Sequence, residues 1–439
     1  MNLFFVSMGC AKNSVDSEHL MGLLVAAGHT IVNDAKKARA GLINTCGFIQ
    51  DAVKENVDAI LDLELLKERG ELEKIVVTGC LVNRYEKELR EELPSVDLWA
   101  RAEEWDSVLA FLGEGAGTPE PATNCVPRGR LAENAPWSRY LKVGEGCDTC
   151  CSYCAIPLIR GRLRSVPIPR LTEEARALAA SGARELCLVG QDLTSYGGDL
   201  YGEPSIERLL TALDESLPPD TWIRLLYLHP DRITFEFLDF LFGMKKVLPY
   251  LDIPIQHIDD GILSAMNRRP ASLHIKNIVR YAREKDPLFA LRTTVMAGFP
   301  GETDEQFEKL VAFLEEAKID RVGAFVYSPE EGTKAALMPR QVPDAVKEAR
   351  RDRLMAAQAL LSRERNGLFV GKTLRVLIEE ADGEGSAWGR SYRDAPEVDG
   401  MVRVEAGGNA NNRLFVPGTF VDVKITDAAE YDLFGEAAC

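Results

Sequence analysis

Short apolar runs alternate with amphipathic stretches along the first 112 residues. The runs LFFVSM (3–8), AGLINT (40–45) and KIVVTG (74–79) are each six residues long and predict buried strands. Between and after them, helical patterns pass through Leu20, Leu23 and Leu24 up to Gly28, over about 49–68, and near 84–93. Strands that alternate with helices in this way predict a parallel sheet with helices on both faces.

A second alternating series runs from 138 to about 335. Its candidate strands are RYLKVG (139–144), ELCLVG (185–190), WIRLLYL (222–228), YLDIPI (250–255), LRTTVMA (291–297) and RVGAFVYS (321–328). Six βα units are too few to close an eight-stranded barrel. Residues 113–137 are rich in Gly, Pro and Ala without periodicity and predict a linker between the two series.

The pattern changes again near the carboxyl end. A polar helical segment over 342–366 leads into 367–439, where strands such as TLRVLIEE and FVDVKI are separated by many turns and no long helix follows. This region predicts a small β-barrel. The fold class is therefore α/β, with three domains at 1–112, 138–366 and 367–439, a division that suits a chain of 439 residues.

Composition indicates a cytoplasmic globular protein. Apolar residues make up 46% and charged residues 27% of the chain, and no run of eighteen apolar residues could cross a membrane. The start, MNLFFVSMGC, lacks a basic segment and a cleavage site, so it predicts a first strand rather than a signal peptide. Ten cysteines without an export signal indicate a reducing compartment and metal binding.

The net charge is −16, from 52 Lys and Arg against 68 Asp and Glu. This balance argues against nucleic acid as a direct substrate, because phosphate binding needs clustered Lys and Arg. The predicted barrel is also acidic, with 7 Lys and Arg against 13 Asp and Glu. An acidic surface suits a basic protein partner.

The highest density of potential metal ligands is in GCDTCCSYCAIPLIRGRLRSVP (146–167), which holds four of the ten cysteines. Cys147, Cys151 and Cys154 could supply three thiolates to an iron–sulfur cluster and leave one iron open. Alternatively, the pairs Cys147/Cys150 and Cys151/Cys154 could hold zinc. Zinc sites usually separate their pairs by a dozen or more residues, so the spacing favours the cluster.

Three further cysteines each follow a predicted strand of the first series. Cys10, Cys46 and Cys80 would lie at the carboxyl ends of parallel strands, which share one crevice, and they could converge on a second metal centre. The alternative is three unrelated buried thiols. Cys125, in the predicted linker, is interpreted as an incidental thiol, and Cys187, within a strand, as a small core residue.

The spacing of Cys147, Cys151, Tyr153 and Cys154 resembles the signature of the radical S-adenosylmethionine enzymes. Together with Cys10, Cys46 and Cys80, it is similar to the methylthiotransferases of that superfamily over essentially the whole chain. The resemblance implies a partial barrel of six βα units and a terminal barrel of the TRAM type. It also implies two [4Fe–4S] clusters: a radical cluster on Cys147, Cys151 and Cys154, and an auxiliary cluster on Cys10, Cys46 and Cys80.

Within that family, several stretches resemble the class that modifies ribosomal protein S twelve rather than the class that modifies an adenosine of transfer RNA. They are IPLIRGRLRSVP (156–167), VGQDLTSYGGD (189–199), LLYLHP (225–230), YLDIPIQH (250–257), YSPEEGT (327–333) and GRSYRDAPEVDG (389–400), the last inside the barrel implied to contact the substrate. The acidic barrel agrees with a basic ribosomal protein as substrate. A non-catalytic metal-binding scaffold for a ribosomal protein is a third alternative.

The resemblance implies a reaction as well. One S-adenosylmethionine would methylate a sulfur, derived from sulfide or polysulfide, on the auxiliary cluster. A second would be cleaved to a radical that removes hydrogen from the β-carbon of an aspartate, giving 3-methylthioaspartate. A low-potential donor such as flavodoxin or ferredoxin would supply the electron.

The residues expected beside S-adenosylmethionine are few. TTVMAGFPGET (293–303) predicts a strand, a Gly-rich turn and a helix, and such a turn lets a ligand approach the backbone closely. A plain strand–turn–helix junction is the alternative. Asp192 and His257 follow strands of the second series, at the end where barrel active sites lie. Each could have a role beside the cofactor or substrate, or a structural role. The resemblance implies that the 293–303 turn lies by the bound S-adenosylmethionine, and the candidates for cofactor binding are Tyr153, Gln191, Gly298, Gly301 and Glu302.

Overall fold

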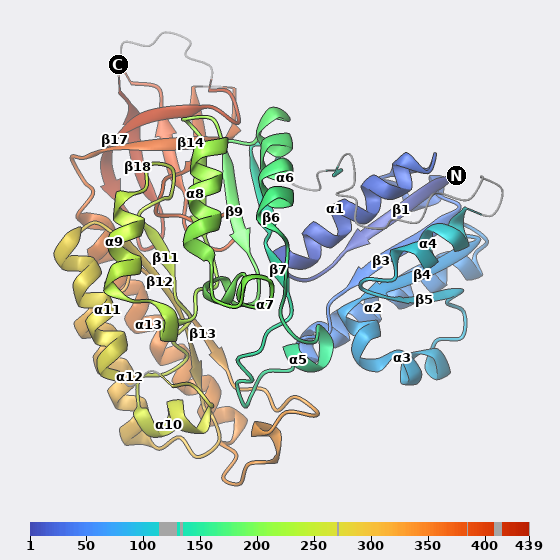
Figure 1. Ribbon diagram of the computed structural model, residues 1–439, viewed down its shortest axis with the longest axis horizontal. Coiled ribbons are helices and arrows are strands. Elements are labelled where there is room, and N and C mark those ends of the chain that lie inside the picture. The colour runs from blue at the N-terminus through green and yellow to red at the C-terminus, as the bar shows by residue number, and fades with distance from the viewer. Residues whose placement is uncertain (114–129, 132–134, 270–271, 384, 408–414, 439) are drawn as a thin grey trace.

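The computed structural model describes residues 1–113, 130–131, 135–269, 272–383, 385–407 and 415–438. Three regions follow one another along the chain, coloured blue to teal, green through yellow to orange, and red-orange to red in Figure 1. Most of the predicted linker, including Cys125, lies outside the described residues. No described helix is both long enough and apolar enough to span a membrane.

The first region is a five-stranded parallel sheet in the order β2-β1-β3-β4-β5. The three strands predicted from the apolar runs are confirmed, whereas β2 and β5 were not predicted; they have three and four residues and lie at the two edges. The strands are β1 (Asn2–Ser7), β2 (Thr30–Val32), β3 (Ala40–Thr45), β4 (Lys74–Gly79) and β5 (Leu98–Arg101).

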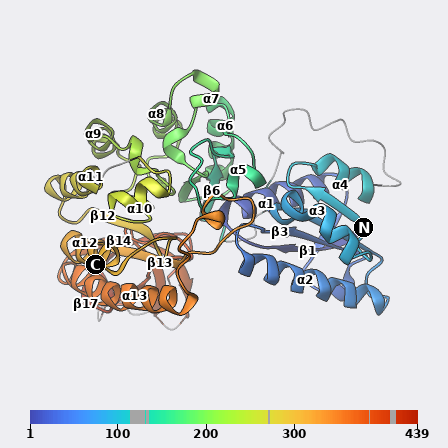
Figure 2. The same ribbon diagram turned by 90° about the horizontal axis from the view of Figure 1, so that it is seen from below.

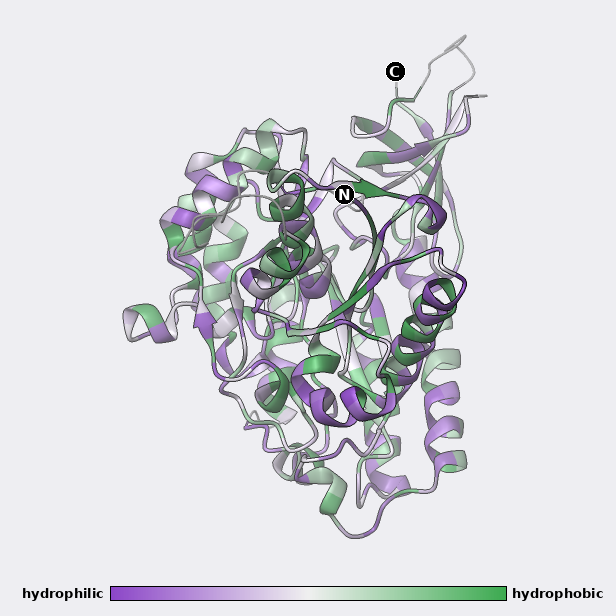
Figure 3. Ribbon diagram, turned by 90° about the vertical axis from the view of Figure 1, so that its right-hand side faces the viewer, coloured by the Kyte–Doolittle hydropathy of each residue, from purple (hydrophilic) through white to green (hydrophobic). Residues whose placement is uncertain are grey.

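Helices cover both faces of this sheet, as predicted. They are α1 (Ala11–Ala26), α2 (Gln50–Glu68), α3 (Cys80–Glu92) and α4 (Trp105–Leu112). Alternate strand residues point to opposite faces, so Ile43 and Val77 pack with α2 and α3, while Leu42 and Val76 pack with α1 and α4. Figure 2 shows α2 and α4 on opposite sides of the strands, and Figure 3 shows the largely hydrophobic strands behind helices of mixed hydropathy.

The second region contains all six predicted strands, and each is parallel to its neighbours. They form two sheets, β10-β9-β6 and β11-β12-β13. A bridge between Ile223 and Val247 joins the sheets, and the Leu228 N–H donates to the Asp252 carbonyl at 2.9 Å. The strands are β6 (Ser138–Lys142), β9 (Glu185–Val189), β10 (Trp222–Leu225), β11 (Tyr250–Asp252), β12 (Ala290–Ala297) and β13 (Arg321–Val326).

The largest apolar cluster of the molecule lies between these strands and their connecting helices. Cys187 is fully buried in β9, which confirms its interpretation as a core residue. The helices are α6 (Ile168–Ala180), α7 (Gly198–Tyr201), α8 (Ile206–Ser216), α9 (Phe235–Gly243), α10 (Asp260–Ala265), α11 (Ser272–Lys285) and α12 (Asp304–Ala317). The polar segment at 342–366 forms the long helix α13 (Asp344–Gly367), which packs on β12 and β13.

The third region is a closed barrel in the order β14-β15-β16-β18-β17, which confirms the predicted small β-barrel. Alternate residues of its strands, such as Val376, Ile378 and Val423, fill the interior. The strands are β14 (Thr373–Ala381), β15 (Ser386–Arg390), β16 (Val402–Glu405), β17 (Phe420–Ala428) and β18 (Leu433–Ala437).

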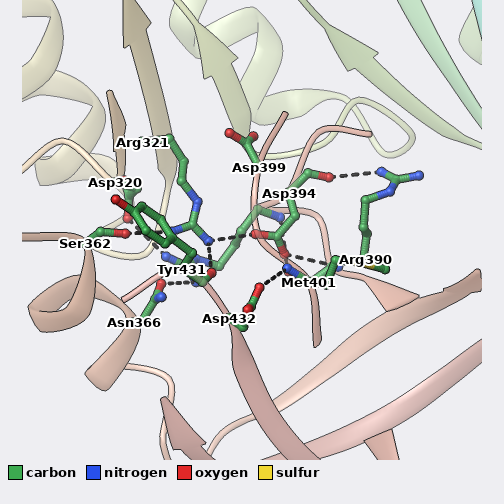
Figure 4. A network of polar contacts seen from close by, with 12 residues as sticks. Asp320, Arg321, Ser362, Asn366, Arg390, Asp394, Asp399, Met401, Tyr431 and Asp432 are labelled. Carbon is green, nitrogen blue, oxygen red and sulfur yellow. Dashed lines mark hydrogen bonds and ion pairs between the residues drawn. The ribbon is translucent and has the colours of Figure 1, made fainter. Parts of the chain in front are cut away.

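The segment that follows β15 joins the barrel to the second region (Figure 4). Arg321 donates to the Asp394 carboxylate at 2.9 Å and to the Ser362 hydroxyl at 2.7 Å, and Arg393 donates to the Asn366 side-chain oxygen at 3.0 Å. Residues 390, 391 and 393–396 are buried, whereas 397 and 398 are exposed. Most of GRSYRDAPEVDG is therefore part of the joint between the two regions, and only its tip could contact a partner.

Candidate functional site

The three strand-end cysteines of the first region lie around the point where its strand order reverses. In a sheet ordered 2-1-3-4-5, the crevice at the carboxyl ends of β1 and β3 is where ligands bind. Cys10 follows β1 and caps α1, and Cys46 follows β3. Cys80 follows β4, although it is the first residue of α3 and the predicted helix near 84–93 thus begins earlier than expected.

Two glycines let these cysteine loops touch. A Cβ added at Gly9 would lie 2.7 Å from the Cys46 Cβ, and one added at Gly47 would lie 3.1 Å from the Cys80 carbonyl carbon. Gly9 also has a φ of +99°, which other residues rarely adopt. The structure therefore brings Cys10, Cys46 and Cys80 together, as the strand-end pattern predicted.

The environment of the three thiols is uneven. Burial raises the pKa of Cys80 to about 12, although the Arg160 guanidinium beside it acts in the opposite direction. Burial also raises the pKa of Cys46. At Cys10, which lies in a recess but retains exposed surface, desolvation is outweighed by Lys12, by the backbone N–H groups of Asn13 and Lys12 and by Arg160, so the pKa is lowered. Iron binds thiolate, so the cationic groups here suit cluster ligation.

Arg160 connects this site to the second region. Its Nε donates to the Cys80 Sγ at 3.0 Å, and its Nη1 donates at 2.9 Å to both Asp16 and Glu145. Its Nη2 donates to the Asn13 side-chain oxygen at 3.0 Å. Arg160 comes from the same stretch as the second cysteine set, so one buried guanidinium links the two candidate metal sites.

The second cysteine set lies on a loop that is closed at its base. Strands β7 (Gly144–Glu145) and β8 (Arg164–Ser165) pair antiparallel, and the short helix α5 (Ile156–Ile159) lies between them in sequence. Gly146 has a φ of +76°, and a Cβ there would collide with the Arg162 carbonyl oxygen. The Cys147 N–H donates to the Gly161 carbonyl at 3.2 Å. The loop is thus held as one unit at the carboxyl end of β6.

Burial raises the pKa of all three predicted radical-cluster cysteines, that of Cys154 to about 12. Arg268 opposes this effect at Cys151 and Cys154, and the Cys147 charge reaches both of them, so the three thiols share one neighbourhood. Cys150 differs, since its side chain is exposed, its φ is +53° and its charge acts on the exposed Arg162.

The donor set fits an iron–sulfur cluster. Backbone and guanidinium N–H groups reach sulfur at both sites, from Thr149 to Cys147 at 3.4 Å and from Arg160 to Cys80. Such N–H contacts to ligand sulfur tune iron–sulfur clusters. Among the described residues, no three His, Cys, Asp or Glu side chains are placed to hold a single metal ion. A [4Fe–4S] cube is ligated at three separate irons, so its thiolates need not meet at one point.

Of the predicted cofactor-binding residues, Tyr153 lies within the cysteine loop and Gln191 contacts its base. The Tyr153 hydroxyl accepts from Arg268 at 3.0 Å, and Gln191 donates to Glu145 at 2.6 Å. Within the described ranges, the buried Oε1 of Gln191 and Nε of Arg268 lack hydrogen-bond partners. Buried polar atoms are normally satisfied, so these two fit a polar ligand such as S-adenosylmethionine.

The other three predicted residues form the turn after β12. Gly298 and Gly301 have φ values of +76° and +84°, and a Cβ at Gly298 would collide with Lys347 of α13. The Glu302 carboxylate accepts from the Gly298 N–H at 2.9 Å and pairs with Arg350 at 2.8 Å. The turn therefore has a structural role, and cofactor binding by Gly298, Gly301 and Glu302 stays a prediction.

Asp192 and His257 also have structural contacts. The Asp192 carboxylate accepts from Thr194 and pairs with Arg232 at 2.8 Å. His257 is fully buried, and its Nδ1 accepts from the Asp259 N–H at 2.9 Å. Desolvation lowers the pKa of His257 to about 4, so the ring is neutral at pH 7.

Several site residues were not predicted from the sequence. No periodic pattern in the sequence indicates a site role for Arg160 or Arg268, although Arg160 lies within the cysteine-rich stretch. Lys12 follows Cys10 by two positions, and its Nζ lies 3.6 Å from the centre of the Tyr227 ring. Only the fold brings Tyr227, which follows β10, to α1.

These features define a radical S-adenosylmethionine enzyme. Residues 141–314 match the radical SAM superfamily, which implies a [4Fe–4S] cluster and S-adenosylmethionine; residues 2–101 match the family described as Uncharacterized protein family UPF0004, and 370–438 match the TRAM domain. The radical S-adenosylmethionine methyltransferase TsrM from Kitasatospora setae shares the fold, with a TM-score of 0.57 and 16% identity over 76% of this chain and 77% of that one.

Full-length relatives are more specific. Ribosomal protein uS12 methylthiotransferase RimO of Geobacter sulfurreducens is 44% identical over 98% of this chain and 97% of its own length. The RimO protein of Symbiobacterium thermophilum is 43% identical over 99% of this chain and 90% of its own length. The chain belongs to the RimO family of methylthiotransferases.

Proposed function

We propose that this protein transfers a methylthio group to the β-carbon of an aspartate in ribosomal protein uS12. The observation that carries the proposal is Arg160, which contacts Cys80 of one three-cysteine set and belongs to the stretch that holds the other. The relatives named RimO support the choice of substrate. The acidic barrel also supports it, because its 7 Lys and Arg stand against 13 Asp and Glu and such a surface suits a basic ribosomal protein.

Two [4Fe–4S] clusters with S-adenosylmethionine, and a sulfide or polysulfide sulfur, would supply the radical and the methylthio group. Cys10, Cys46 and Cys80 would hold the auxiliary cluster, and Cys147, Cys151 and Cys154 the radical cluster. Arg160 and Asp16 would fix the distance between the two loops because their side chains are buried and paired. Gln191 and Arg268 would orient S-adenosylmethionine through their unpartnered polar atoms. Flavodoxin or ferredoxin would deliver the electron.

Iron content tests the assignment of the two cysteine sets. After anaerobic reconstitution we expect two clusters per chain, about half that iron in Cys10→Ala and about half in Cys151→Ala. Cys150→Ala is the matched control and should keep full iron, since Cys150 is exposed beside the three ligands. Full iron in Cys10→Ala, or loss of iron in Cys150→Ala, would contradict the assignment.

Mass spectrometry tests the substrate. The reconstituted, reduced enzyme is offered S-adenosylmethionine with purified uS12 or with transfer RNA. We expect release of 5′-deoxyadenosine and replacement of one hydrogen by SCH3 on a uS12 aspartate. The same mass gain on an adenosine, with none on uS12, would assign the chain to the transfer-RNA reaction. Absence of 5′-deoxyadenosine would leave a non-catalytic scaffold.

A further inference from the structure

Lys12 places a cation where the first two regions meet. It is the second residue of α1, two positions after Cys10, and it is partly buried. Its Nζ lies 3.6 Å from the centre of the Tyr227 ring. Tyr227 follows β10, at the same end of the second region's strands as the radical-cluster loop. The ammonium therefore lies on the boundary between the two cysteine sets.

Hydrogen bonds hold the backbone of Tyr227, whose ring contacts this ammonium, in one position. It adopts a φ of +65°, which is uncommon for a residue with a side chain. Its N–H donates to the Asp252 carboxylate at 3.0 Å, and its carbonyl accepts from the Leu193 N–H at 3.1 Å. A strained conformation that is held from both sides is typical of ligand-binding positions.

The other cations around the two cysteine sets are already occupied by protein groups. Arg160 and Lys142 share the carboxylates of Asp16 and Glu145. Arg232 pairs with Asp192, and Arg268 donates to the Tyr153 hydroxyl and to the Pro254 carbonyl. None of the ion pairs found among the described residues involves Lys12. Cys10, Tyr227 and Glu145 offset the cost of burying this ammonium, which leaves it charged and without a carboxylate in direct contact among the described residues.

We propose that Lys12 binds the side-chain carboxylate of the substrate aspartate. This inference rests on the proposed function. The carboxylate of aspartate is bonded to the β-carbon, so an ion pair at Lys12 would hold the reacting carbon on the boundary between the two cysteine sets. A ring face on one side leaves the ammonium N–H groups free to donate on the other. Lys12 would thus select aspartate over asparagine.

Binding of uS12 tests the inference without requiring turnover. The reconstituted full-length enzyme is titrated with purified uS12 and with uS12 in which the target aspartate is replaced by asparagine. Loss of a hydrogen bond to a charged group weakens binding by about 10- to 100-fold. We therefore expect wild-type enzyme to prefer the aspartate form by that factor, and Lys12→Met to bind both forms with the weaker affinity. Lys12→Arg should restore part of the preference, and Lys36→Met, at an exposed lysine of the same region, should leave it unchanged.

The outcomes separate the possible failures. If the aspartate preference in Lys12→Met equals that of wild-type enzyme, the inference is wrong while the proposed function stands. The same holds if Lys12→Met loses cluster iron but keeps the preference, because Lys12 would then act on the cluster alone. If wild-type enzyme binds neither form of uS12, the proposed function fails and the inference fails with it.

Discussion

The first region and the barrel are both attached to the second region, but the two interfaces are built differently. The first region is held mainly by ion pairs, such as Arg84 with Glu330 at 2.9 Å and the contacts of Arg160, with a small apolar patch of Cys80, Ala155 and Ile159. The barrel inserts apolar side chains, including Leu377 and Ala395, into a larger cluster with Tyr250 and Leu226.

The positions of the charges differ as well. Glu185 is fully buried between Arg224 at 2.7 Å and Arg390 at 2.5 Å, on the barrel side of β9. Arg160, in contrast, donates directly to a predicted cluster ligand. The barrel interface can therefore hold its geometry without any cofactor, whereas the first interface is continuous with the candidate site.

The largest expected effect is at the barrel interface. Glu185→Gln leaves the buried Arg224 without a carboxylate partner and Arg390 with Glu379 alone, and breaking a buried pair costs about 3–5 kcal/mol. We expect denaturant unfolding to show a loss of that size with normal iron content in the folded protein. Glu308→Gln, which removes an exposed pair with Arg353, is the control and should leave the stability nearly unchanged, because exposed pairs contribute little. A similar loss in both variants would contradict the contrast between the interfaces.

A smaller loss of stability, with a loss of iron, is expected at the first interface. Arg160→Met removes the donor to Cys80 and one cation from Asp16 and Glu145, while Lys142 still pairs with both. The cost should therefore stay below about 3 kcal/mol, and the auxiliary site should take up less iron after reconstitution. Arg162→Met removes an arginine two positions away that is 89% exposed and should change neither quantity. Full iron in Arg160→Met would show that the site does not depend on this interface.

The smallest effect is one of pH. Burial acts to raise the pKa of Glu185 above its ordinary value of 4.5, but Arg390 and Arg224 outweigh burial and lower the pKa to about 2. A lowered pKa stabilises the fold above about pH 4.5, and this contribution is lost as the pH falls towards 2. The difference in unfolding free energy between wild type and Glu185→Gln should thus be constant from pH 5 to 7 and shrink below pH 4.5. A difference that grows on acidification would contradict the charged state of Glu185.

The sequence predicted what depends on local pattern. The apolar runs located β1, β3 and β4, and the position of a cysteine after each strand led to a shared site, because parallel strands end at one edge. The edge strands β2 and β5 are too short to show a pattern of their own. The start of α3 at Cys80 was missed because the helix begins with Gly79 as its cap rather than with a polar capping residue.

Long-range pairing accounts for most of what could not be predicted. GRSYRDAPEVDG is rich in charge and would ordinarily be placed on the surface. Most of it is buried because its charges find partners far away in the sequence, as Asp394 does with Arg321 and Arg390 with Glu185. Lys12 and Tyr227 are likewise 215 positions apart, and no periodicity relates them.

The joint around residues 390–396 has a consequence for protein engineering and for how this architecture can diversify. A terminal barrel is often treated as a portable module, to be exchanged between enzymes in order to redirect them to new substrates. Here the barrel carries Arg390 and Arg393, and the carboxylates that pair with them, Glu185 and Asp320, belong to the neighbouring region. A transplanted barrel would lack these carboxylates unless both sides were moved together, whereas the exposed Val398 could be altered without removing any of these ion pairs.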